Sequence, residues 1–313
     1  MPYEFEKEII NTILTRANSY IEYCQKGQLI RGIQKSFSKP KITSLITVFN
    51  SEKYIRQAIC SIQNQNMVDI EILIIDDNSG DNSFSIIEEI KKTDKRIKVI
   101  RNKKNRGALY SKSLGIIKAQ GKYTMILDSD DLFINEELFV LCFNESIQNN
   151  IDIIEFSGFW SYLSKFNLNG RLFKTTLKII GKQVYNKKIN YGDDRLINFI
   201  LFKTSKSFKF IKQFGYIYNY NNVSITHSNK TFNNCHDELI NIDHIYKYTK
   251  FSNDSEIVVF EIFHRYERII KPGLNKENWK YLQNLIMTLL SNKYISDFNK
   301  KKLLNLTNNI KMA

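Results

Sequence analysis

Residues 70–80 read IEILIIDDNSG, and residues 122–131 read KYTMILDSDD. Each segment is a run of mostly apolar residues that ends in a cluster of acids. Such runs are typical of strands that are covered on both faces, as in a parallel sheet. In open α/β sheets, ligands bind beyond the carboxyl ends of these strands. The two acidic clusters are therefore expected in one crevice, where their carboxylates can hold a nucleotide and a metal ion.

Strand and helix patterns alternate between residue 42 and about residue 150. The expected strands are 42–48, 70–75, 96–100 and 123–128, and the expected helices are 53–65, 83–92, 107–118 and 135–148. This alternation predicts right-handed crossovers and a sheet flanked by helices. The fold class is thus α/β, with a Rossmann-like, mostly parallel sheet.

The rest of the chain carries weaker patterns. Apolar residues at helical spacing predict a helix over 3–26 and three or four amphipathic helices after residue 232, with a break at Pro272-Gly273. Between them we expect a helix that begins near Asp193 and strands at 151–156, 208–211 and 216–220. The expected regions are an N-terminal helix and linker, an α/β domain and a C-terminal helical region: 1–40, 41–232 and 233–313.

The composition indicates a folded protein. The chain has 313 residues, of which 42% are hydrophobic, enough for one large domain or two modest ones. No window has the ~20 apolar residues of a membrane span, and acids interrupt any signal-peptide core near Met1. The cysteines lack CxxC spacing and are expected to be reduced core residues: Cys24, Cys60, Cys142 and Cys235. We therefore expect a cytoplasmic protein, with the cytoplasmic face of the membrane as an open alternative.

The net charge of +14 favours anionic partners. Nucleotides, phosphorylated sugars and an anionic membrane face all fit, whereas a lysine-rich solvated surface explains the charge without any partner. The lysine runs are short and separate, and no recognition helix, zinc finger or RNA-binding aromatic motif accompanies them. We expect no nucleic-acid partner, and a peripheral membrane contact stays open.

Short motifs follow one another in a fixed order through residues 41–135. They are Leu45-Ile46-Thr47-Val48-Phe49-Asn50, Ser61-Ile62-Gln63-Asn64-Gln65, Ile75-Asp76-Asp77-Asn78-Ser79, Asn105-Arg106-Gly107, and Gly121-Lys122-Tyr123 before Asp128-Ser129-Asp130-Asp131. Together they resemble the family 2 glycosyltransferases with the GT-A fold. Gly192-Asp193-Asp194 and the tyrosines of 216–220 resemble the acceptor side of the same family. The resemblance implies a nucleotide-binding half over 41–135 and an acceptor half over 136–232.

For the acids of residues 128–131, the resemblance implies a DXD motif. Asp130 is expected to be the main ligand of Mn²⁺ or Mg²⁺, and Asp128 to contact the ribose or a metal-bound water, or the metal itself. Such ions prefer carboxylate and phosphate oxygens and act as Lewis acids on a leaving diphosphate. Asp131 alternatively caps a following helix, because acids favour helix N-termini.

The nucleobase is expected near the ends of the first two strands. The resemblance implies that Asp77 accepts a hydrogen bond from the base and that Thr47 and Phe49 shape its pocket. Asp76 fits a structural turn, since Asp-Asp-Asn-Ser-Gly is also a competent turn sequence. Phe49 alternatively packs in the core.

Two basic residues are expected near the diphosphate. Arg106 precedes a helix whose free N–H groups favour anions. Lys112 stands where the family usually has arginine; it supplies charge without a bidentate fork. A surface lysine is the open alternative at this position.

Asp194 is the expected general base. An inverting transfer needs a carboxylate that takes the proton of the acceptor hydroxyl, and Asp193 would orient it. A plain helix cap is the alternative. The resemblance thus implies a hexosyl- or N-acetylhexosaminyl-transferase of polysaccharide or glycan biosynthesis, with a UDP-sugar donor and a glycan, lipid or protein acceptor. The alternative is a non-catalytic nucleotide-sugar binding or scaffold protein of the same fold.

Overall fold

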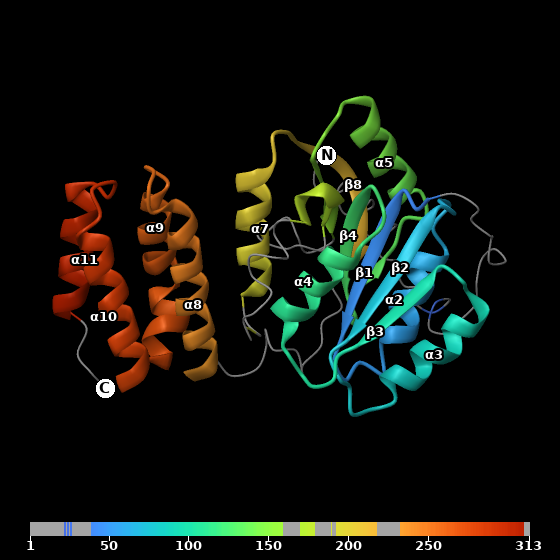
Figure 1. Ribbon diagram of the computed structural model, residues 1–313, viewed down its shortest axis with the longest axis horizontal. Helices are drawn as coiled ribbons and strands as arrows, with labels where there is room; N and C mark the ends of the chain where they lie inside the picture. Colours follow the sequence, from blue (N-terminus) through green and yellow to red (C-terminus); the bar gives the residue numbers. More distant parts are fainter. Residues whose placement is uncertain are drawn as a thin grey trace, which may run out of the picture. The chain divides into compact units, whose positions relative to one another are not determined.

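The computed structural model describes residues 22, 24, 26, 39–158, 170–178, 189, 192–217 and 232–309. The chain divides into two compact units (Figure 1). The first comprises Met1–Lys188 and Ile200–Asn221, and the second comprises Ile189–Phe199 and Asn222–Ala313. Part of the predicted α/β domain, residues 189–199, therefore clusters with the C-terminal residues. The division into functional regions at 40, 135 and 232 stays a prediction.

An eight-stranded sheet forms the centre of the first unit, with strand order β3-β2-β1-β4-β7-β6-β8-β5. The strands are β1 (Ile42–Val48), β2 (Ile70–Asp76), β3 (Ile97–Arg101), β4 (Tyr123–Asp128), β5 (Leu132–Phe133), β6 (Ile153–Gly158), β7 (Arg171–Lys174) and β8 (Phe208–Ile217). β1 pairs in parallel with β2 and β4, and β2 pairs in parallel with β3. The predicted parallel core is confirmed.

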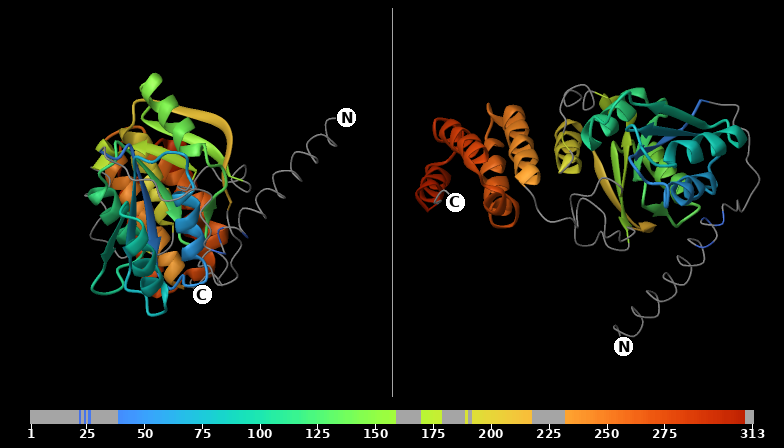
Figure 2. Two further views of the ribbon diagram at one scale, coloured as in Figure 1. Left: turned by 90° about the vertical axis from the view of Figure 1, so that its right-hand side faces the viewer. Right: turned by 90° about the horizontal axis from the view of Figure 1, so that it is seen from below.

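Helices cover both faces of this sheet (Figure 2). They are α2 (Ile55–Gln63), α3 (Ser83–Thr93), α4 (Ala108–Lys118) and α5 (Leu138–Gln148). Side chains alternate along β1: Ile46 joins the core with α2 and α5, whereas Leu45 lies under Gly115 of α4. Each central strand is thus buried on both sides, which explains its continuous apolar run.

The far half of the sheet departs from the expected parallel pattern. β7 is antiparallel to both β4 and β6, whereas β6 and β8 pair in parallel with a bulged register. The sequence analysis missed β5 and β7, which have two and four residues, too few for a period to be recognised. It also split β8, which runs unbroken over Phe208–Ile217.

The described part of the second unit is helical, apart from its turns. Its helices are α8 (Phe232–Thr249), α9 (Ser255–Arg265), α10 (Lys276–Leu290) and α11 (Asp297–Asn309). The first residues of α7 (Asp193–Thr204), up to Phe199, also belong to this unit. A π-helical turn over Tyr266–Ile270 and a 3₁₀ turn over Lys271–Gly273 separate α9 from α10. The expected break at Pro272-Gly273 is confirmed. Asn275 then caps α10, accepting a hydrogen bond from Asn278 N at 2.8 Å.

Several expectations fall outside the described residues. They include most of the helix over 3–26 and the tyrosines at 218 and 220. All four cysteines are buried free thiols, as predicted. Across the described helices, none combines the length and apolarity that crossing a bilayer requires.

Candidate functional site

The carboxyl ends of three neighbouring strands form the candidate donor site. β1 lies between β2 and β4, with Val48 opposite Asp76 on one side and Thr47 opposite Asp128 on the other. Neighbouring strands lie about 4.8 Å apart, so the two acidic clusters flank the end of β1 within about 10 Å. The prediction that both clusters share one edge of the sheet is confirmed.

Asp76 is a structural turn acid. Its carboxylate is fully buried, lies 3.0 Å from Nε of Arg101 and accepts a hydrogen bond from Ser79 N. The guanidinium of Arg101 also lies over the ring of Phe84, 4.3 Å from its centroid. These contacts hold the β2–α3 turn, so the carboxylate of Asp76 is committed to structure.

Asp77 anchors the start of α4. Its Oδ1 accepts hydrogen bonds from Nδ2 of Asn102 at 2.7 Å and from Arg106 N at 2.8 Å, and its Oδ2 accepts from Gly107 N at 2.8 Å. A carboxylate has about four acceptor positions, so these bonds use three of them. The sequence analysis missed Asn102; its only signal was an amide directly after β3.

The N-terminus of α4 faces the same strand ends through this anchor. Gly107 precedes the helix with φ of 88°, a conformation that favours glycine. No acid lies in the first turn, and the first N–H groups of any α-helix lack intrahelical acceptors. The guanidinium of Arg106 lies 4.3 Å from the ring centroid of Tyr110. The helix start thus combines the charge of Arg106 with the positive end of the helix dipole, which suits a phosphate.

Lys112 lies inside the site. It is buried, at 4% exposure, and its Nζ lies 3.2 Å from Oδ1 of Asp128, whose side chain is 33% exposed. The alternative of a surface lysine is therefore wrong. A buried ammonium requires a paired charge, and Asp128 provides it.

The loop that carries residues 128–131 is tightly held. Ser129 Oγ lies 2.6 Å from Ser51 Oγ of the loop after β1, and Asp131 N donates to the carbonyl of Asp128 at 3.1 Å. Asp131 is fully buried, and the next element is β5; α5 begins only at Leu138. The alternative that Asp131 caps a following helix is wrong.

The acids suit a metal that is shared with a bound phosphate. Within the described ranges, no three His, Cys, Asp or Glu side chains are grouped so that they could hold an ion. Mg²⁺ typically uses one or two carboxylates together with substrate phosphates, and this donor set offers Asp128 and Asp130. The residues present fit a cation of this kind.

Thr47 and Phe49 flank the end of β1. Thr47 is half-buried, and Phe49 is 50% exposed, so the alternative of core packing for Phe49 is wrong. An exposed ring at a strand end is available for stacking on a planar ligand.

Asp193 and Asp194 lie in the second unit, in the first turn of α7. Asp193 is buried and Asp194 is half-buried. Carboxylates at a helix N-terminus interact favourably with the helix dipole. This position is compatible with both expected roles of Asp194, a helix cap and a general base.

Solved structures define the class of fold. The chain resembles the crystal structure of S. aureus TarS 1-349 in complex with UDP-GlcNAc, with a TM-score of 0.65, 15% identity, and coverage of 80% of this chain and 81% of that one. It also resembles the mannosyltransferase PcManGT from Pyrobaculum calidifontis in complex with GDP-Man and Mn²⁺, with a TM-score of 0.55, 11% identity, and coverage of 95% and 94%. The fold is therefore the GT-A fold, as predicted.

The family follows from the sequence comparison. Residues 43–195, just under half of the chain, match the model of glycosyl transferase family 2, which assigns this segment to that family. An uncharacterized glycosyltransferase of Haemophilus influenzae is 41% identical over 99 residues, covering 32% of this chain and 40% of that protein. The Campylobacter jejuni GalNAc(5)-diNAcBac-PP-undecaprenol beta-1,3-glucosyltransferase is 36% identical over 103 residues, covering 33% of each. The chain thus spans less than half the length of these curated relatives.

Proposed function

We propose that the chain is an inverting glycosyltransferase that moves a hexosyl or N-acetylhexosaminyl group from a UDP-sugar to an acceptor hydroxyl. The observation that carries this proposal is the register of β1 with β2 and β4, which brings Asp77, Thr47 and Asp128 to one sheet edge. The start of α4 and Lys112 add positive charge there. A nucleotide diphosphate needs this combination of acceptors for its base and cations for its phosphates.

The base and the diphosphate would use different parts of the site. The remaining acceptor position of Asp77 suits the single ring N–H of uracil, and Phe49 and Thr47 would line the base pocket. Arg106 and Lys112 would lie near the phosphates. Bound Mn²⁺ or Mg²⁺, held by Asp130 and Asp128, would supply Lewis acidity to the departing UDP. TarS was crystallised with UDP-GlcNAc and PcManGT with Mn²⁺, which supports both assignments by analogy.

Asp194 would act as the general base. It would accept the proton of the acceptor hydroxyl while that oxygen bonds to the anomeric carbon and the bond to UDP breaks. Its half-buried place in the first turn of α7 keeps the carboxylate accessible to an acceptor. The adjacent Asp193 is buried and would orient the turn.

A lipid-linked acceptor at the cytoplasmic membrane face is the acceptor we favour. The C. jejuni relative carries an undecaprenol-linked substrate in its name. This chain has no acid between Asp194 and Asp237. Within that stretch lies an exposed surface, here called the aromatic-basic edge, formed by Phe202, Lys206, Phe208, Phe210 and Lys212.

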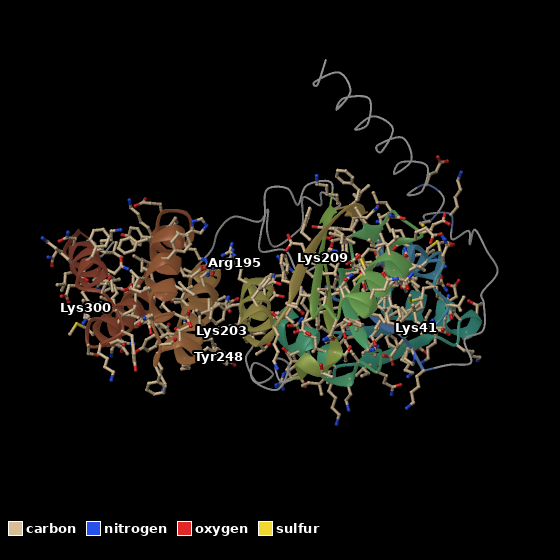
Figure 3. The ribbon with its side chains drawn as sticks, turned by 90° about the horizontal axis from the view of Figure 1, so that it is seen from above. Lys41, Arg195, Lys203, Lys209, Tyr248 and Lys300 are labelled. Atoms are coloured by element: carbon tan, nitrogen blue, oxygen red, sulfur yellow. The ribbon has the colours of Figure 1, made fainter. Side chains whose placement is uncertain are left out.

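The geometry of the aromatic-basic edge suits an anionic bilayer. The rings of Phe202 and Phe208 lie 5.3 Å apart, and Phe208, Phe210 and Lys212 alternate along one side of β8, with Lys209 (Figure 3) between them. Aromatic rings and lysines are the residues that anchor proteins at membrane interfaces.

Release of UDP tests the proposed activity. The purified chain with Mn²⁺ is incubated with a panel of UDP-sugars and lipid-linked and glycan acceptors, and UDP is measured. We expect turnover with at least one pair, none for Asp130→Ala, and only a small residual turnover for Asp194→Asn. A folded protein that binds UDP tightly but turns over nothing would instead be the non-catalytic binding protein.

A further inference from the structure

A buried ion-pair network lies behind the first turn of α7, within the second unit. Glu238 of α8 is fully buried, and its two carboxylate oxygens face two arginines. Oε1 lies 2.5 Å from Nη1 of Arg195, and Oε2 lies 2.5 Å from Nη1 of Arg265. Arg265 also pairs with Glu261 of α9. Two carboxylates and two guanidinium groups thus form a cluster in which the charges balance, and only Arg195 is substantially exposed.

Arg195 (Figure 3) connects this network to the acids of α7, because it directly follows Asp194. Its side chain is 28% exposed, whereas Arg265 is 3% exposed, so Arg195 is the outer member of the cluster. The neighbouring backbone is held as well: Arg195 N donates to the carbonyl of Gly192 at 3.2 Å.

Gly192 provides an independent sign that this turn is pressed against α8. Its φ is +74°, which favours glycine, and a Cβ there would lie 2.8 Å from Nδ2 of Asn241 and 3.1 Å from Oε1 of Glu238. Any larger residue would push the turn away from Glu238. The turn that precedes Asp193 and Asp194 therefore packs directly on α8.

The far side of the network is also an irregular part of the fold. α9 ends at Arg265, and the π-helical turn Tyr266–Ile270 begins at the next residue. Single π-helical turns are rare and are frequently found at functional sites. Glu238 thus holds one arginine in the first turn of α7 and one at the last residue of α9, where regular helix ends.

We propose that Glu238 is a positioning residue for Asp194, and that the C-terminal helices thereby form part of the catalytic machinery. This inference rests on the proposed function of Asp194. Glu238 holds the guanidinium of Arg195, and Arg195 with Gly192 fixes the turn from which Asp194 extends. A base must be held within a fraction of an ångström of its productive position, and a displacement of about 1 Å costs roughly 100-fold in rate.

Two variants test the inference. Glu238→Gln keeps the shape of the side chain but removes its charge, and Arg195→Gln cuts the link to α7 while leaving the Glu238–Arg265 pair intact. We expect each to lower kcat by about 10- to 100-fold, with the KM for the UDP-sugar and the affinity for UDP unchanged. If Glu238→Gln does not fold, Arg195→Gln alone tests the inference. Arg195 is partly exposed, so its replacement should disturb the fold less than replacement of the buried Glu238.

Glu256→Gln is the matched control. Glu256 lies in α9 of the same unit and accepts hydrogen bonds from Ser296 N at 2.5 Å and from Asn299, which lie just before and within α11 rather than in α7. We expect this variant to lower the unfolding temperature and leave kcat unchanged. A loss of kcat in Glu256→Gln equal to that of Glu238→Gln would show a general packing effect and overturn the inference.

A double variant identifies the route of the effect. If Glu238 acts through Asp194, then Glu238→Gln has no further effect on the residual turnover of Asp194→Asn, whereas a purely structural residue lowers both backgrounds by the same factor. Equal factors, or normal kcat in both Glu238→Gln and Arg195→Gln, overturn the inference while leaving the proposed function intact. Full activity of Asp194→Asn would instead reject the proposed base itself.

Discussion

The ammonium nitrogen of Lys112 lies 3.2 Å from Oδ1 of Asp128, joining the middle of α4 to the end of β4. Lys112 is almost fully buried, whereas Asp128 is partly exposed at the sheet edge. The fold thus places a fixed positive charge beside the acids of residues 128–131. Before any ligand binds, this charge offsets part of the repulsion between those acids and a diphosphate.

Replacing Lys112 by methionine removes this charge at similar length. We expect kcat/KM for the UDP-sugar to fall by about 100-fold, as when one fixed electrostatic donor is deleted from a site. Lys112→Arg should retain part of the activity. Lys118→Met, at the exposed end of the same helix, is the control and should behave as wild type. Near-normal kinetics of Lys112→Met would contradict the role of this charge.

Asp77→Asn should weaken both the fold and donor binding. An amide keeps only one acceptor oxygen, so its NH₂ group faces either Gly107 N or the donors of Arg106 and Asn102, leaving at least one of them unsatisfied at a cost of about 1–3 kcal/mol. Thermal unfolding and UDP calorimetry measure the two effects. Asp81→Asn, which disturbs the start of α3 instead, should lower stability without changing UDP affinity. Unchanged UDP affinity in Asp77→Asn would refute this prediction.

Mn²⁺ and UDP should stabilise the protein together more than separately. Asp128 and Asp130 alone offer few ligands, so Mn²⁺ alone should shift the unfolding temperature little; with UDP, the phosphates complete the site. At a hundredfold excess over Kd, bound ligand adds about 2.7 kcal/mol to stability. Asp130→Ala should abolish the synergy, as should EDTA. Equal shifts with and without Mn²⁺ would argue against a shared metal.

The free energy of unfolding is expected to depend on pH through Asp94. Burial raises the pKa of Asp94, but hydrogen bonds and the charge of Arg96, with a hydrogen bond from Gln63, outweigh it and hold the pKa below its ordinary 3.8. Since the pKa of Asp94 is lower in the folded than in the unfolded protein, ionised Asp94 adds to the free energy of unfolding. This contribution is fully present above pH 3.8 and is lost as pH falls through the folded pKa.

Denaturant unfolding of Asp94→Asn checks this prediction. At pH 7 the variant should lose about 3 kcal/mol, because Arg96 is left buried and unpaired, and the difference from wild type should shrink below pH 3.8. Glu89→Gln, which removes an exposed partner of Arg56, should cost less than about 1 kcal/mol. A loss in Asp94→Asn that is constant from pH 7 to pH 3 would contradict the assignment.

The aromatic-basic edge should bind anionic vesicles. Two lysines near a membrane contribute about 1 kcal/mol each, so Lys206→Gln with Lys212→Gln should weaken binding to phosphatidylglycerol vesicles by roughly 30-fold. Lys300→Gln with Lys301→Gln changes the net charge equally on α11 and is the control. Binding should weaken with salt and be absent on zwitterionic vesicles. Equal losses in both double variants would indicate an effect of net charge alone.

Local sequence was sufficient for the central strands and for the order of the acids along them. β1, β2 and β4 are apolar on both faces, a pattern that can be recognised without knowing which strands they pair with. The acids directly follow or end β2 and β4. It was insufficient for β5 and β7, whose short runs depend on strands far away in the chain.

By itself, therefore, the sequence determined the parallel core, the family and which acids lie at strand ends, because these depend on periodicity and on residues within a few positions of one another. Only the tertiary structure decided what those acids contact. Asp77 takes donors from residues 25 to 30 positions away, Lys112 reaches Asp128, and Glu238 joins Arg195 to Arg265. Pairings over such separations are selected by packing and burial of charge, which leave no period in the chain.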